Sequence, residues 1–296
     1  IKALHTPGHT SDSFSFLMNN YLFSGDTLLI NGTGRTDFQN GSAKDSYNSI
    51  FNKLLKLPEE TLLYPCHDYN GKKVSTIGNE KKFNPRLRVK DEQEYIDMMT
   101  SFADSFPNIC KTHHLGTLNS GREIVIVQIS DNVGQKEDEP SFLYTSSMHG
   151  DELSGYVLSL RLIDYILNGY NDNARLTDLV NNIDIWINPL TNPDGAYFGG
   201  NQDVWSATRY NSNWVDLNRN YPDPEDGPHP DGNPYQEETN IFLGLADSIN
   251  FNMAANMHDG AEVCNYPWET WSVLTADDNW WQYVSTEYAD SCQTNS

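Results

Sequence analysis

The chain has 296 residues and a formal net charge of −22, with 19 Lys and Arg against 41 Asp and Glu. Such an acidic chain argues against a nucleic acid or an anionic membrane as a partner. No run of 18 or more apolar residues is present to span a membrane, and the length allows two domains.

The charge divides the chain into two unlike pieces. Residues 1–100 contain 12 basic and 12 acidic residues, so residues 101–296 carry the whole net charge of −22. A charged run with helical spacing, residues 91–99, lies at the border between them. We therefore expect one domain over residues 1–100 and a second over residues 101–296.

The first piece combines a hairpin pattern with polar motifs. Phe14, Phe16 and Met18 alternate with other residues before Asn19-Asn20, which predicts two strands and a turn. Three polar motifs lie at the ends of apolar stretches: His5-Thr-Pro-Gly-His9-Thr, Phe23-Ser-Gly-Asp26-Thr and Tyr64-Pro-Cys-His67-Asp-Tyr69.

At these motifs the first piece resembles the second half of a metallo-β-lactamase-fold domain. The segment Gly34-Arg35-Thr-Asp-Phe-Gln39 and the residues His67-Asp-Tyr69 are most similar to the persulfide dioxygenase branch, a group of non-haem iron enzymes. The resemblance implies that His9 and Asp26 are metal ligands and that His67 lines the site. It also implies that Arg35 and Tyr69 lie near the substrate, whereas His5 is expected to be structural.

The resemblance covers only half of that fold. Its paired half, with a His-x-His-x-Asp-His loop that supplies further ligands, has no counterpart in the chain. A catalytic iron needs two His and one carboxylate, so we expect iron only if the domain were complete. The first piece is thus expected to be a partial αββα half-domain whose uncovered sheet exposes an apolar face.

The second piece shows alternating strand and helix patterns. Residues 141–148 form a short apolar-rich run typical of a buried strand, and apolar residues then recur at helical spacing over 153–167. Residues 183–187 alternate as a strand, which we expect to end in a turn at 192–195, and residues 253–257 alternate again. The order favours an α/β sheet with a site where strands hand over to loops.

Five motifs follow one another along these elements: His149-Gly-Asp-Glu152, Asn192-Pro-Asp-Gly195, Thr208-Arg209, Leu217-Asn218-Arg219-Asn220 and Met257-His258-Asp-Gly260. A His and a Glu three residues apart can face the same way, and a second His on another strand completes a zinc site with one position left for water. Arginine can clamp a carboxylate because its guanidinium donates two parallel hydrogen bonds.

In their order and spacing these motifs resemble the zinc metallocarboxypeptidase family, from about residue 106 to the end of the chain. The resemblance implies a mixed-sheet α/β fold, one zinc ion, and peptide or protein C-termini as substrates. It further assigns the site residues by role: zinc ligands His149, Glu152 and His258; Arg209 for the oxyanion; Asn218 and Arg219 for the terminal carboxylate of the peptide.

The resemblance is incomplete at the C-terminal end. In the family, a general-base Glu lies well downstream of the last His ligand, whereas 38 residues follow His258 here. Glu287 is expected to be a surface residue of a helix. We therefore expect a C-terminally truncated, catalytically impaired chain, for which a gene fragment, a partial reading frame or a misassembled fusion is the simplest explanation.

A further motif concerns the side chain that would be removed. Asn265-Tyr-Pro-Trp-Glu269 stands at the spacing where the regulatory-type carboxypeptidase subfamily has Asn-Tyr-Pro-x-Asp, whose acidic residue lines the pocket for the terminal side chain. Glu269 would then favour Lys or Arg. The alternative is that Glu269 is a solvated loop residue.

Two other functions stay open. One is persulfide dioxygenase or metal-dependent thioester hydrolase activity from the first piece, and the other is a non-catalytic binder of zinc or of peptide C-termini. The residues do not fix a compartment. The resemblances favour secretion or the periplasm for the second piece and the cytoplasm for the first.

Overall fold

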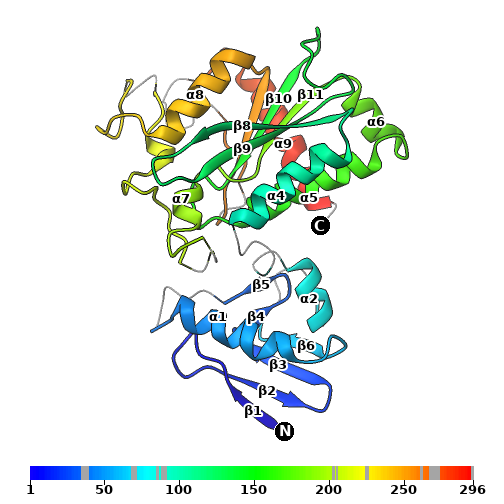
Figure 1. Cartoon of the computed structure of the whole chain (residues 1–296), viewed down its shortest axis with the longest axis vertical. Helices are drawn as coiled ribbons and strands as arrows, with labels where there is room; N and C mark the ends of the chain where they lie inside the picture. The colour runs from blue at the N-terminus through cyan, green and yellow to red at the C-terminus, as the bar shows by residue number, and fades with distance from the viewer. Residues whose placement is uncertain are drawn as a thin grey trace.

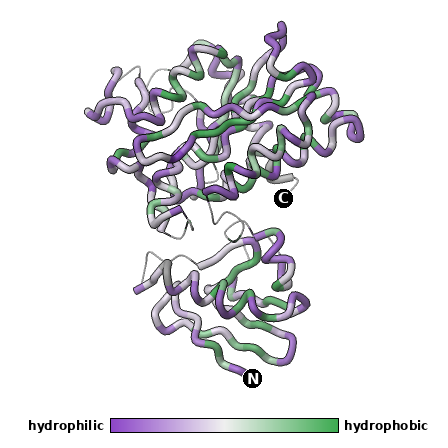
Figure 2. The backbone as a smooth tube through the Cα atoms, in the orientation of Figure 1, coloured by the Kyte–Doolittle hydropathy of each residue, from purple (hydrophilic) through white to green (hydrophobic). Residues whose placement is uncertain are grey.

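The computed structural model describes two parts, each built on a five-stranded sheet (Figure 1). The described residues are 1–34, 40–67, 72–84, 87, 92–201, 204, 206–223, 227–260, 263–266 and 274–294. Hydrophobic stretches follow the strands of both sheets, while loops are mostly hydrophilic (Figure 2). No helix among the described residues is both long enough and apolar enough to cross a membrane.

The sheet of the first part has the strand order β1-β2-β3-β6-β7. Its strands are β1 (Lys2–His5), β2 (Phe14–Met18), β3 (Tyr21–Gly25), β6 (Leu62–Pro65) and β7 (Ser75–Thr76). Only β3 and β6 pair in parallel. The predicted hairpin is present, with Asn19 in the left-handed region at φ 53° between β2 and β3.

One face of this sheet packs on helices and the other is open. The remaining elements are β4 (Leu28–Leu29), β5 (Gly32–Thr33), α1 (Ala43–Asn52), the 3-10 helix η1 (Leu54–Lys56) and α2 (Ile77–Phe83). Leu22 and Leu63 of the sheet form a buried cluster with Ile50 of α1 and Ile77 of α2. On the other face, exposed side chains include Phe14, Phe16 and Phe23, which confirms the expected apolar surface.

The sheet of the second part has the order β12-β10-β11-β9-β8 and is mixed. Its strands are β8 (Cys110–Thr117), β9 (Glu123–Ile129), β10 (Ser141–Ser146), β11 (Asp184–Asn188) and β12 (Met253–Met257). The three strands β12, β10 and β11 run parallel, and β9 and β8 are antiparallel to their neighbours. The predicted mixed-sheet α/β fold is confirmed.

Helices cover both faces of this sheet. They are α4 (Glu92–Ser105), α5 (Ser154–Gly169), α6 (Ala174–Val180), α7 (Pro193–Ala196), the 3-10 helix η2 (Leu217–Arg219), α8 (Glu237–Ile249) and α9 (Asp278–Thr294). Val125 and Val127 of β9 pack in a core with α4, α5 and α6, whereas Ile124 and Ile126 face Phe242 of α8. Strand β9 is therefore buried on both faces, as is usual for an inner strand.

Most expected elements are present. The apolar run at 141–148 contains β10, the helical pattern after Glu152 is α5, and the alternating runs are β11 and β12. The turn expected at 192–195 takes the form of a single turn of helix over Pro193–Ala196. The Asn192 side chain caps it by accepting a hydrogen bond from the Gly195 N–H at 2.8 Å.

The position of helix α4 determines where the boundary between the two parts lies. The helical run at its N-terminal half was expected to close the first piece, with the second starting at residue 101. Tyr95, Met99 and Phe102 of α4 instead lie in the core formed with α5 and β9. We therefore propose that the second part begins with α4.

Candidate metal centre

Two strands bring the predicted zinc ligands together. His149 and Glu152 lie between β10 and α5, and His258 directly follows β12. Strands β10 and β12 are parallel neighbours, with Ser146 paired to Met257, so their carboxyl ends meet at one edge of the sheet. Open α/β sheets usually place their sites at this edge.

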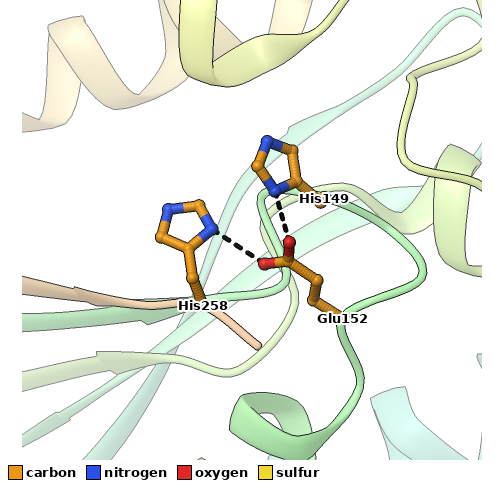
Figure 3. Close-up of side chains that lie close together, drawn as sticks. All are labelled: His149, Glu152 and His258. Carbon is orange, nitrogen blue, oxygen red and sulfur yellow. Dashed lines mark hydrogen bonds and ion pairs between the residues drawn. The ribbon is translucent and has the colours of Figure 1, made fainter. Parts of the chain in front are cut away.

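The three side chains converge on one another (Figure 3). Nδ1 of His149 lies 2.7 Å from Oε1 of Glu152, and Nδ1 of His258 lies 2.8 Å from Oε2 of the same carboxylate. The two imidazole rings are 4.8 Å apart between centroids. His149 is buried, while the His258 side chain is 32% exposed and forms the open side of the cluster.

The donor set suits zinc. Two imidazole nitrogens and a carboxylate are the three protein ligands of many catalytic zinc sites. Tetrahedral zinc with ligands near 2.1 Å holds neighbouring ligand atoms about 3.4 Å apart. The observed separations of 2.7 and 2.8 Å are hydrogen-bond distances, so the side chains must open slightly to admit the ion.

Nδ1 of His149 lies between an acceptor and a donor. Nη1 of Arg209 lies 3.2 Å from Nδ1 of His149 and can only donate, whereas Glu152 as a carboxylate can only accept. Nδ1 cannot accept from the guanidinium and donate to the carboxylate at once. The two contacts therefore cannot both be hydrogen bonds of Nδ1 at the same time.

Glu152 is held in its anionic form. Burial alone would raise the pKa of Glu152, but hydrogen bonds from His149 and His258 outweigh it and keep the pKa well below the usual range. The carboxylate also accepts a hydrogen bond from the backbone N–H of Asp259 at 3.2 Å. The cluster therefore presents a negative charge between two imidazoles, which is the charge a divalent cation needs.

Asp216 supports the site and was not predicted from the sequence. Its Oδ1 lies 3.1 Å from Nε2 of His149, and its Oδ2 accepts a hydrogen bond from Nε of Arg209 at 2.9 Å. Burial opposes ionisation of Asp216, but the Arg209 hydrogen bond and nearby positive charge lower its pKa. Carboxylates in this position orient metal-binding histidines. The available signal was an acidic residue between Arg209 and the Asn218-Arg219 pair.

The second histidine has its own support, also missed at the sequence level. Nδ2 of Asn256 lies 3.0 Å from Nε2 of His258, and Thr145 donates to Oδ1 of Asn256 at 3.0 Å. Asn256 lies on β12, two residues before His258, so side-chain alternation places both on the same face.

Of the predicted substrate residues, Arg209 contacts this cluster, and Asn218 and Arg219 lie on η2 next to Asp216. Arg209 is fixed by Asp216, which leaves Nη1 directed at His149. Asn218 and Arg219 are exposed on η2, and Oδ1 of Asp216 accepts the Asn218 backbone N–H at 3.0 Å. The same aspartate thus links the arginine, the histidine and η2. Glu269 lies outside the described residues.

A glycine allows the loops of the site to meet. A Cβ atom on Gly150 would lie 2.2 Å from the Gly195 carbonyl carbon, so a side chain at this position would force the loops apart. Asn192 also donates from Nδ2 to the Met148 carbonyl at 3.2 Å. The motifs His149–Glu152 and Asn192–Gly195 are therefore packed against each other.

The predicted residues of the first part are only partly assembled. Nε2 of His9 lies 3.8 Å from Oδ2 of Asp26, and Nε2 of His67 lies 3.5 Å from Oδ1 of Asp26. Oδ1 of Asp26 is buried and has no hydrogen-bond partner. Nε2 of His5 lies 3.1 Å from the Ser11 carbonyl oxygen. Arg35 and Tyr69 lie outside the described residues.

Comparisons with known families match both parts of the chain. Residues 95–296 match the zinc carboxypeptidase family model, and residues 1–67 match that of the metallo-β-lactamase superfamily. Human carboxypeptidase D is 37% identical over 226 residues, covering 72% of this chain and 16% of that protein. Human mitochondrial persulfide dioxygenase is 47% identical over 96 residues, covering 32% of this chain and 37% of that protein.

Solved structures add information on the fold. Carboxypeptidase A from Helicoverpa armigera aligns with a TM-score of 0.55 at 21% identity, covering 67% of this chain and 52% of that chain. Human carboxypeptidase N catalytic chain is 32% identical in sequence over 217 residues, covering 62% of this chain and 47% of that protein. The chain thus spans about a sixth of carboxypeptidase D and about half of the other carboxypeptidases.

Proposed function

The chain belongs to the zinc carboxypeptidase family, and on that premise we propose that its second part binds one zinc ion and acts on the C-terminal peptide bond of peptides or proteins. The observation that carries the proposal is the convergence of His149, Glu152 and His258. When bound, zinc lowers the pKa of a water molecule and polarises a carbonyl group.

The other residues have separate tasks. Arg209 has Nη1 free of its aspartate and directed into the centre, where it can stabilise an oxyanion. Asn218 and Arg219, exposed on the adjoining η2, would hold the terminal carboxylate. Asp216 contacts both His149 and Arg209 and so fixes the orientation of the two side chains relative to each other.

Metal analysis tests this proposal. The purified chain should bind about one zinc ion, and His149→Ala should abolish binding because two remaining ligands do not close a site. His114→Ala is the matched control, since His114 is exposed and pairs with Glu123 away from the cluster. Unaltered zinc in His149→Ala would refute the site.

We further propose that the 296-residue chain binds peptides but cleaves them slowly. The family places its general base downstream of the last histidine, and Glu287, the glutamate on α9, is exposed. Loss of general base catalysis costs about 10²- to 10⁴-fold in rate. Turnover by this chain at the rate of a carboxypeptidase with that base would contradict this proposal. In the same assay, an enzyme would release C-terminal residues from the peptides, whereas a purely binding protein would bind the peptides without cleaving them.

The proposed preference is for C-terminal Lys or Arg, read by Glu269. Tyr266, three residues before Glu269, is anchored, because its hydroxyl donates to Asp278 at 3.0 Å and its ring stacks on Trp281 of α9. Peptides ending in Lys or Arg should bind at least tenfold more tightly than peptides ending in Leu. Glu269→Gln should remove most of that difference, and a preference that survived it would place specificity elsewhere.

A second candidate function belongs to the first part. His9 and His67 each lie within 4 Å of Asp26, and two imidazoles with one carboxylate are the combination used by non-haem iron enzymes, but their ligand atoms do not converge as those of His149, Glu152 and His258 do. Persulfide dioxygenase or thioester hydrolase activity is the corresponding proposal. Iron content that falls in Asp26→Asn but not in His149→Ala would support it, and an iron-free chain after loading with ferrous iron would refute it.

A further inference from the structure

Three exposed aromatic side chains gather on and against the loop that joins Arg209 to Asp216. Phe198, Tyr210 and Trp214 are 48%, 38% and 61% exposed. The Phe198 and Trp214 rings meet edge to face at 5.3 Å and 70°, and the Tyr210 and Trp214 rings lie 5.9 Å apart at 48°. We call these three residues the aromatic ledge. Contiguous exposed apolar surface of this kind commonly marks an interaction site.

Two residues of the ledge, Tyr210 and Trp214, lie on a loop whose two ends contact the metal centre. Residues 209–216 begin with Arg209, whose Nη1 is 3.2 Å from His149, and end with Asp216, whose Oδ1 is 3.1 Å from the same ring. Tyr210 directly follows the arginine, and Trp214 precedes the aspartate by two residues. A peptide bound at the centre therefore has the ledge within reach of its last few residues.

The loop is built to hold Trp214 outward. Oδ1 of the buried Asn211 accepts the backbone N–H groups of Asn213 and Val215 at 3.0 and 3.1 Å. Trp214 has φ 59°, in the left-handed region that a bulky residue rarely occupies. Such strain persists only where surrounding contacts enforce it, and it clusters at ligand sites.

Charge and ring chemistry identify the occupant. Residues 101–296 carry the whole net charge of −22, so a cationic peptide is attracted to this part of the chain. The faces of Trp and Tyr attract cations, and the planar guanidinium of Arg stacks on them. We propose that the aromatic ledge binds an Arg side chain of the substrate, at the second or third residue from the peptide's C-terminus. This inference rests on the proposed carboxypeptidase function.

Calorimetric titration of the zinc-loaded full chain tests the inference. The peptides share a C-terminal Lys and carry Arg, Leu or Ala at the second or third residue from the end. The Arg peptides should bind about three- to fivefold more tightly than the Leu and Ala peptides. Trp214→Gly should abolish that ratio, and Trp214→Phe should retain part of it because an aromatic face remains.

The variants are chosen to separate binding from folding. Glycine tolerates φ 59° better than Trp, so Trp214→Gly should unfold at no lower temperature than the parent chain. Tyr165→Leu is the matched control, because Tyr165 is 58% exposed on α5 outside the ledge, and it should keep the ratio.

The outcomes distinguish this inference from the function on which it rests. Equal affinity for Arg and Leu peptides, or an Arg preference that survives Trp214→Gly, would overturn the role of the ledge while leaving the zinc site in place. Failure of every peptide to bind the zinc-loaded chain would overturn both.

Discussion

At the scale of single residues, one carboxylate connects the predicted zinc ligand His149 to residues predicted to bind the substrate. Asp216 contacts His149 and Arg209, and its Oδ1 also accepts the Asn218 backbone N–H. Its importance is invisible in the spacing of the ligands, because it lies 67 residues from His149 and reaches it only in the folded chain.

Asp216→Asn should weaken zinc binding about 10- to 100-fold without unfolding the chain, because the imidazole loses the anionic partner that orients it. Competition with a zinc chelator measures the affinity. Asp172→Asn, an exposed substitution outside the site, should leave it unchanged. Equal zinc affinity in both variants would show that Asp216 has no positioning role.

A second residue-scale prediction concerns pH. Burial, together with repulsion from Asp194, raises the pKa of Glu238, although hydrogen bonds from its own backbone and from Asn211 oppose this shift. The unfolded chain therefore loses this proton at lower pH than the folded chain. The carboxyl group costs no stability below the unfolded pKa and destabilises the fold progressively as the pH rises above it.

Glu238→Gln should consequently unfold at the same denaturant concentration as the parent at acid pH and at a higher concentration at pH 7. The glutamine keeps an oxygen for the hydrogen bond from Asn211, 3.2 Å away in the parent. Asp247→Asn, exposed on the same helix α8, is the control and should show no such pH-dependent gain. A gain that was equal at both pH values would exclude titration as its cause.

At the scale of elements, the partly buried Arg122 links α4 to α7. Nη1 of Arg122 donates to Asp194 at 2.7 Å, Nη2 donates to the Tyr197 carbonyl at 2.8 Å, and Nε lies 3.5 Å from Glu92. Asp194 is 3% exposed, so it depends on the guanidinium for its charge balance. Helix α7 in turn packs against the loop that carries His149.

Arg122→Met should lower the free energy of unfolding of the second part by about 3–5 kcal/mol, because it leaves the Asp194 charge buried and unpaired. Urea titration monitored by Trp fluorescence measures the change. Arg175→Met, exposed on α6, should change stability by no more than about 0.5 kcal/mol. Similar values for the two variants would show that the Arg122 contacts contribute little.

At the scale of the whole molecule, the two parts differ in both charge and surface. The first piece is electrically neutral and exposes Phe14, Phe16 and Phe23 on one sheet face, while the second carries the full negative charge. Self-association should therefore proceed through the first part, because the second parts of two chains repel each other.

Phe16 and Phe23 are cross-strand partners on β2 and β3, so a double replacement by Thr removes the centre of the apolar face while retaining β propensity. Light scattering should show less concentration-dependent association of Phe16→Thr/Phe23→Thr than of the parent. Zinc content should be equal in the two proteins. Undiminished association would show that the chains associate through another surface.

Sequence patterns were enough to identify the families of both parts, the mixed α/β class and most strands and helices near the site. Motif order and local periodicity carry that information, because a strand or helix displays its buried face within a few residues. The family model confirms membership of the zinc carboxypeptidase family, which was expected from His149-x-x-Glu152, the Asn218-Arg219 pair and His258. The zinc and substrate roles of these residues stay predictions.

The contacts between distant residues became visible in the folded chain alone. Periodicity identifies a buried face but not the neighbour that covers it, so the pairing of β10 with β12 and the association of α4 with the second core were not readable from the chain. The same holds for Asp216 at His149 and for the ring contacts of Trp214. Each depends on contacts between residues far apart in sequence or on a loop whose shape is set by buried side chains.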